Sequence, residues 1–148
     1  MQTEPRPGTT PPKYGPPISL ELAKRIMLAA EAEATSNGWP MVIAILDSGV
    51  NLVMLHRLDH ANHGAVPLAQ RKAETAVKFR RSTKVFEDLL CADTKGLRML
   101  SMASELIAVE GGVPLLQNGE VIGSIGVSGM MSHQDGQVAL AGARVLDG

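Results

Sequence analysis

The chain has 148 residues, of which 45% are hydrophobic and 3% aromatic, and its formal charge is −1. This length suffices for one domain with its own core, and a charge near zero gives no general attraction to nucleic acid. No apolar run approaches about 18 residues, so no membrane span is expected. The single cysteine, Cys91, permits no internal disulfide, and a cytoplasmic protein is predicted.

The first 17 residues, MQTEPRPGTTPPKYGPP, contain six prolines and no apolar stretch. They predict an extended arm over residues 1–17 rather than a secretory signal. Such an arm is either disordered or lies across a neighbouring subunit. No internal repeat follows, so residues 18–148 are predicted to form a single domain.

A helix is predicted at the start of this domain. Ser19 can cap it, and apolar side chains that recur every four residues continue it to about Asn37. Gly38 then supplies a stop. The short apolar run MVIAIL at 41–46 follows, and it predicts a buried central strand.

Turn residues lead from this run to a second predicted strand, LVMLHR at 52–57. Alternation along it places His56 and Arg57 on opposite faces. A second long helix is expected from Pro67 to about Arg80, because proline suits the first turn of a helix.

Lys72 shares a face of that helix with its apolar positions, so at least its stem should meet packed structure. Residues 83–103 predict one or two shorter helices, broken near Asp93 and Gly96.

The last third is predicted to be mainly strands. ELIAVE (105–110) is expected to be one, and Asn118-Gly119 predicts a type I′ hairpin between two others. A terminal helix with Asp135 near its start completes the chain. The order α-β-β-α-(α)-β-β-β-α predicts an α+β fold, with an antiparallel sheet of about five strands covered by helices.

Three of the four histidines lie with an aspartate in HRLDHANHG, residues 56–64. Imidazole and carboxylate bind zinc or iron, and they also move protons near neutral pH. The spacing His56-x3-His60-x2-His63 matches no compact metal motif, so no metal site is predicted. A polar loop at a ligand cleft is favoured, and acid–base use of one histidine remains open.

The segment GSIGVSG is rich in glycine but is neither a P-loop nor a dinucleotide fingerprint. Bare backbone at Gly126 and Gly129 could bind an anion, or it could allow tight packing against a helix. Ser128, His133 and Asp135 are not framed by a nucleophile elbow, which argues against a serine hydrolase.

Three segments in this order resemble the GlcG/HbpS family: SLELAKRIMLAAEAEATSNGWPMVIAILDSGVNLVMLHRLD, LAQRKAETAVKF and GGVPLLQNGEVIGSIGVSGMMSHQD. The resemblance spans about residues 18–146. It implies a profilin-like fold and homo-oligomers. It also implies that some members bind haem or a corrinoid, while others accompany catabolic enzymes in operons.

Carried over by position, the family's pattern falls on a set of polar and glycine residues: Asp47, Arg57, Asp59, Lys72, Thr75, Thr83, Gly111, Gly112, Pro114, Gly123, Gly126, Ser128, Gly129 and Asp135. The family's usual glycine and apolar residues after Asp59 are replaced here by His60, Ala61, Asn62 and His63. Haem-binding members use a histidine in or near the first helix, and here none precedes His56. The candidate iron ligands are then His56, His60 and His63.

The favoured hypothesis is an accessory protein of a catabolic or cofactor pathway that binds a small ligand: haem, a corrinoid or an anionic metabolite. Its predicted ligand-binding residues are His56, Arg57, Asp59, Lys72, Thr75, Gly112, Gly126, Ser128, Gly129 and Asp135. This prediction requires the histidine-rich segment and the glycine-rich strand to line the same hollow.

The alternative is a cofactor-independent hydrolase, isomerase or lyase acting on a small anion. Arg57 and Lys72 would hold the anion, and His60, His63 or His133 would move a proton. A partner of a larger enzyme is the third hypothesis.

Overall fold

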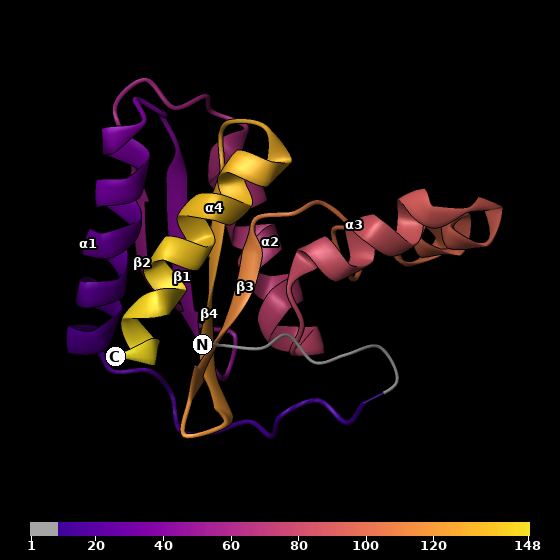
Figure 1. Ribbon diagram of the computed structural model, residues 1–148, viewed down its shortest axis with the longest axis horizontal. Helices are drawn as coiled ribbons and strands as arrows, with labels where there is room; N and C mark the ends of the chain where they lie inside the picture. The colour runs from indigo at the N-terminus through magenta and orange to yellow at the C-terminus, as the bar shows by residue number, and fades with distance from the viewer. Residues whose placement is uncertain (1–8) are drawn as a thin grey trace.

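The computed structural model describes residues 9–148 and arranges them in three layers, with helices on both faces of one sheet (Figure 1). α1 (Leu20–Ser36) and α4 (Ser132–Ala143), which continues into η2 (Arg144–Asp147), lie on one face. α2 (Ala65–Phe79) lies on the other. None of the described helices is long and apolar enough to cross a membrane.

The sheet has four antiparallel strands in the order β2-β1-β4-β3, rather than the expected five or so. The strands are β1 (Val42–Asp47), β2 (Leu52–Arg57), β3 (Gly112–Gln117) and β4 (Glu120–Ser128). The predicted α+β class is therefore confirmed, and β1 and β4 form the centre of the sheet.

The central strand β1 is buried on both faces, as its continuous apolar run predicted. Ile43 and Ile45 pack in the core under α1 and α4, whereas Val42 and Ala44 pack against α2. Burial of each isoleucine side chain contributes about 1.5–3 kcal/mol to the free energy of unfolding. The core thus consists of two layers that share one strand.

The chain between the two halves of the sheet forms a helical protrusion. α3 (Thr83–Ala92) and η1 (Thr94–Met102) extend away from the body of the molecule (Figure 1). Of the one or two short helices predicted here, two are present, and the break lies at Asp93. Phe86, Met99 and Leu106 form a small apolar core of their own beneath this protrusion. It is separate from the two layers of the main core.

The prediction of a strand at residues 105–110 was wrong, because this segment forms no strand in the structure. Two backbone N–H groups of this segment bond to helix side chains, and those of Glu105 and Leu106 donate to Met102 O, so none of these four pairs with a strand. Ile107 N donates to Thr75 Oγ1 at 3.1 Å, and Glu110 N donates to Glu87 Oε1 at 3.3 Å. The apolar residues of the segment serve the small core below the protrusion, which periodicity alone does not reveal.

The described part of the predicted arm lies against its own domain; its first eight residues lie outside the described part. Gly15 N donates to Val121 O at 2.8 Å. The Tyr14 hydroxyl donates to Val77 O at 2.8 Å, and the Arg80 guanidinium lies 5.1 Å from the centroid of the Tyr14 ring. An aromatic anchor therefore holds this segment along the edge of the fold.

Candidate functional site

A hollow of about 430 Å³ opens near the end of α1, where β1 begins and β2 ends. The residues that line it are Thr35, Gly38, Trp39, Pro40, Leu58, Asp59 and His60. Its volume lies within the range of small-molecule sites, about 300–1,000 Å³. Apolar and aromatic groups make up part of its wall, and an imidazole and a carboxylate supply the polar part.

The sharp end of α1 places the aromatic part of this wall. Gly38 adopts φ 71°, in the left-handed region, and confirms the predicted helix stop. Trp39 N then donates to Ala34 O at 2.9 Å, which folds the chain back over the last turn. As a result the half-buried Trp39 stands beside Pro40 at the mouth of the hollow.

His60 is held at the rim by a tight turn. Ala61 N donates to Leu58 O at 3.1 Å, and Leu58 N donates to Met41 O at 2.9 Å, so this turn is anchored to the sheet. His60 is the third residue of the turn and has φ 72°, a conformation uncommon outside glycine. The backbone thereby sets its position next to Asp59 in the wall.

The other histidines lie elsewhere. The His56 ring contacts the Glu31 carboxylate of α1, and His63 is exposed in the loop before α2. His133 is exposed in the first turn of α4. Within residues 9–148, no three His, Cys, Asp or Glu side chains are grouped so that they could hold a metal ion. Of the four histidines, His60 alone lines the hollow described above.

A second cluster of the predicted residues is buried. Lys72 Nζ lies 2.9 Å from Asp135 Oδ2 and donates to Val127 O at 3.1 Å. Asp135 Oδ1 accepts from Met130 N at 3.0 Å, which ties the start of α4. Burial raises the pKa of Asp135, and the hydrogen bond from Lys72 opposes that rise. The enzyme hypothesis required Lys72 to hold a substrate anion. In the structure its ammonium group is instead paired with Asp135 inside the protein.

The glycines of β3 and β4 permit close packing against α2. A Cβ at Gly126 would overlap the carbonyl oxygen of Ala69, and one at Gly112 would overlap that of Lys72. Only residues without a side chain fit where two backbones approach so closely. Of the two interpretations left open for Gly126, tight packing therefore accounts for this glycine, and it accounts for Gly112 as well.

A separate hollow of about 90 Å³ lies next to Gly112. It is lined by Ser82, Lys84, Glu110, Gly111, Gly112, Val113, Gly136 and Leu140. It is well below the size of small-molecule sites. No histidine lines it, and no residue of the glycine-rich segment 123–129 lines the His60 hollow, so neither hollow joins the two segments as predicted.

The remaining predicted residues occupy the same end of the sheet or serve the fold. Arg57 and Ser128 flank Val42 on either side, with Arg57 exposed and Ser128 buried. Gly129 follows directly with φ 147°. Thr75 Oγ1 accepts from a backbone N–H of the 105–110 segment. None of these four predicted residues lines the larger hollow.

Sequence reasoning missed Thr35, Trp39, Pro40 and Leu58 as wall residues. One signal was present: Trp39 is the only tryptophan in an aromatic-poor chain, and it follows directly after a helix stop. A large aromatic group in such a position is a frequent element of binding sites. Its partner Leu58 lies in a distant segment, and only the folded chain brings the two together.

A four-stranded antiparallel sheet with helices on both faces defines an α+β protein of the profilin-like type. A family model described as "Haem degrading protein HbpS-like" matches residues 18–144. The chain belongs to this HbpS-like family. Protein GlcG of Escherichia coli K12 is 40% identical over 111 residues, which cover 75% of this chain and 81% of GlcG.

Two solved structures support the same assignment. The crystal structure of Klebsiella pneumoniae protein ORFY superposes with a TM-score of 0.80 and 26% identity, covering 94% of this chain and 97% of that one. The crystal structure described as "PduOC:Heme Complex" superposes with a TM-score of 0.78 and 25% identity, covering 88% and 96%. One structural relative is therefore known in complex with haem.

Proposed function

We propose that this protein is a small-ligand-binding accessory protein and that haem, or a related tetrapyrrole, is its ligand. Family membership and the haem complex of a structural relative support the ligand class. The observation that carries the proposal is the hollow of about 430 Å³ in which His60 and Trp39 share a wall.

The residues present fit a haem at this place. Haem iron takes its protein ligand from a small set of side chains, of which histidine is the most frequent. His60 supplies an imidazole at the rim, and Trp39, Pro40 and Leu58 supply apolar surface for the macrocycle. A haem bound there would contribute iron-centred redox chemistry.

The test is a haem titration followed by two signals. We expect a Soret band distinct from that of free haem, together with quenching of tryptophan fluorescence. Because Trp39 is the only tryptophan, its quenching reports binding at this wall. A titration in which neither signal saturates would count against the proposal.

His60→Asn and His63→Asn form a matched pair of variants. Asparagine tolerates the left-handed backbone at position 60, so the turn should survive while the imidazole is lost. His63 lies in the same loop but outside the wall. We expect His60→Asn to abolish the bound Soret spectrum and His63→Asn to leave it unchanged. Equal effects of the two variants would contradict the assigned ligand.

We also infer that the protein forms homo-oligomers through its helical protrusion. Leu89, Leu97 and Leu100 are exposed on α3 and η1, an apolar concentration typical of protein interfaces. A second copy of the chain is the proposed occupant. Light scattering after gel filtration should show a lower mass for the Leu97→Glu/Leu100→Glu variant than for Leu28→Glu on α1. A monomeric wild type would refute the inference.

A cytoplasmic location is inferred alongside the accessory role in a catabolic or cofactor pathway. Cys91 is exposed and free, as thiols remain in a reducing compartment. Cell fractionation checks the location, and recovery of the protein outside the cytoplasm would contradict it.

A further inference from the structure

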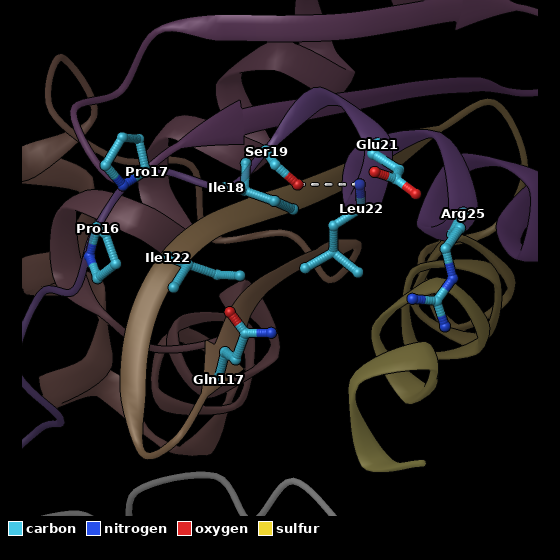
Figure 2. A pocket seen from close by; sticks show the side chains of 9 residues that line it. All are labelled: Pro16, Pro17, Ile18, Ser19, Glu21, Leu22, Arg25, Gln117 and Ile122. Atoms are coloured by element: carbon cyan, nitrogen blue, oxygen red, sulfur yellow. Dashed lines mark hydrogen bonds between the residues drawn. The ribbon is translucent and has the colours of Figure 1, made fainter.

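A different hollow, of about 350 Å³, lies at the opposite end of α1 from the His60 wall. Two parts of the chain that are distant in the sequence form it, as Figure 2 shows: the end of the arm with the first turns of α1 that follow it, and the β3–β4 hairpin. Its apolar wall consists of Pro16, Pro17, Ile18, Leu22 and Ile122. Ile18 N donates to Ile122 O at 2.9 Å, so the arm side of this wall is fixed to β4.

Three polar side chains of this hollow, those of Glu21, Arg25 and Gln117, have no partner among residues 9–148. The Arg25 guanidinium and the Gln117 amide form no hydrogen bond or ion pair within that part of the chain. Ser19 differs, because its hydroxyl already accepts from Leu22 N at 3.1 Å (Figure 2). Arg25 therefore offers free donors next to apolar surface, the combination that binds a carboxylate group attached to an apolar body.

Glu21 is the one acidic residue in this wall. It precedes Arg25 by four residues on α1, the spacing at which opposite charges can pair. The two side chains form no ion pair in the structure. Both are exposed, and exposed pairs of this kind are weak, so Glu21 does not withdraw Arg25 from a ligand. Its negative charge repels every anionic ligand, and it repels ligands with more than one anionic group most strongly.

We propose that this hollow binds a small monocarboxylate with an apolar chain. The carboxylate pairs with Arg25, and the chain covers Leu22 and Ile122. Gln117 remains available for a further polar group on the ligand. This site goes beyond the proposed haem function: it shares no wall residue with the His60 hollow, so either proposal can fail while the other stands.

Hexanoate is the probe, and hexan-1-ol is its uncharged match. Backbone amide shifts of residues 18–25, 117 and 122 in two-dimensional NMR should move saturably with hexanoate and not with hexan-1-ol. Amides around His60 should stay in place. The proposal is overturned if hexanoate causes no saturable shifts at these residues, or if the alcohol binds equally well.

Arg25→Gln should weaken hexanoate binding roughly tenfold or more, since a charge-assisted pair is lost. Lys24→Gln is the matched control, because Lys24 is an exposed neighbour that does not line the hollow, and screening should limit its effect to less than about twofold. Glu21→Gln should tighten binding by removing a like charge. Equal affinities of the Arg25 and Lys24 variants would overturn the proposal, and so would weaker binding in Glu21→Gln.

Discussion

Lys72 and Asp135 form an ion pair of 2.9 Å in which each side chain is only 3% exposed. The pair joins the middle of α2 to the first turn of α4 beside the end of β4. Both charged groups are thus withdrawn from water, and the attraction between them offsets the free-energy cost of their burial. The sequence resemblance counted both as ligand-binding residues, whereas here they hold two layers of the fold together.

Removal of one partner should be costly. Lys72→Met leaves the Asp135 carboxylate buried without its cation, so we expect the free energy of unfolding to fall by about 3–5 kcal/mol. Urea denaturation at pH 7 measures it. The control is Lys84→Met, which breaks an exposed pair with Asp88 at 2.7 Å and should cost less than about 1 kcal/mol. Similar losses in the two variants would show that the buried ion pair contributes no more to stability than the exposed one.

Glu110 should make stability depend on pH. Burial and the neighbouring Glu87 raise the pKa of Glu110 in the folded state, while Lys84 and His133 lower it partly. Ionisation of Glu110 therefore costs more in the folded than in the unfolded protein. Its contribution to stability is complete below the unfolded pKa of about 4.3 and is lost as pH rises through the higher folded pKa.

The variant Glu110→Gln lacks this loss. Its free energy of unfolding, relative to that of the wild type, should increase as pH rises from 4 to 7. Urea titrations at several pH values in this window measure the difference. A difference that is constant or decreases with pH would contradict the raised pKa.

Gly126 should not tolerate a side chain. A methyl group there would overlap the Ala69 carbonyl of α2, so Gly126→Ala should destabilise the protein by about 1–3 kcal/mol through overpacking. Gly64→Ala is the matched control. At Gly64, φ is −64° and the nearest atom to an added Cβ is 3.5 Å away, so its effect should be neutral or slightly stabilising. Thermal unfolding compares the two.

Tyr14 should anchor the arm. Its hydroxyl lies 2.8 Å from Val77 O and 2.9 Å from Lys78 O, and its one proton is shared between these two acceptors. Tyr14→Phe keeps the ring under Arg80 and removes these bonds, so a loss of about 0.5–1.5 kcal/mol is expected. Lys13→Gln changes an exposed neighbour and should have little effect. Denaturation that does not distinguish the two variants would mean that the hydroxyl contributes nothing.

Much of the fold could be predicted locally. The cap at Ser19, the stop at Gly38 and the Asn118-Gly119 hairpin are short-range signals, and each is confirmed. Backbone sterics and side-chain capping determine such features within a few residues. The error at 105–110 has the opposite origin. There a tertiary contact, Thr75 with the N–H of Ile107, replaced the strand pairing that the apolar run predicted.

The candidate site was less predictable for the same reason. Asp59 and His60 were named from sequence, and they do line a hollow, but their companion Trp39 comes from the connection between α1 and β1, which precedes them in the chain by two strands. The glycines of β4 were noticed as unusual, yet whether they faced a ligand or a helix depended on where α2 packs. Local composition shows that a segment is unusually rich in one residue type, but it does not show which distant segments lie against it in the fold.

By itself, then, the sequence determined the order and kind of most elements and the family, because periodicity, caps and turns act over a few residues. Only the tertiary structure decided that Lys72 pairs with Asp135 and that His60 and Trp39 line the same hollow. Contacts between distant segments arise from the packing of whole helices and strands, which no short stretch of chain encodes.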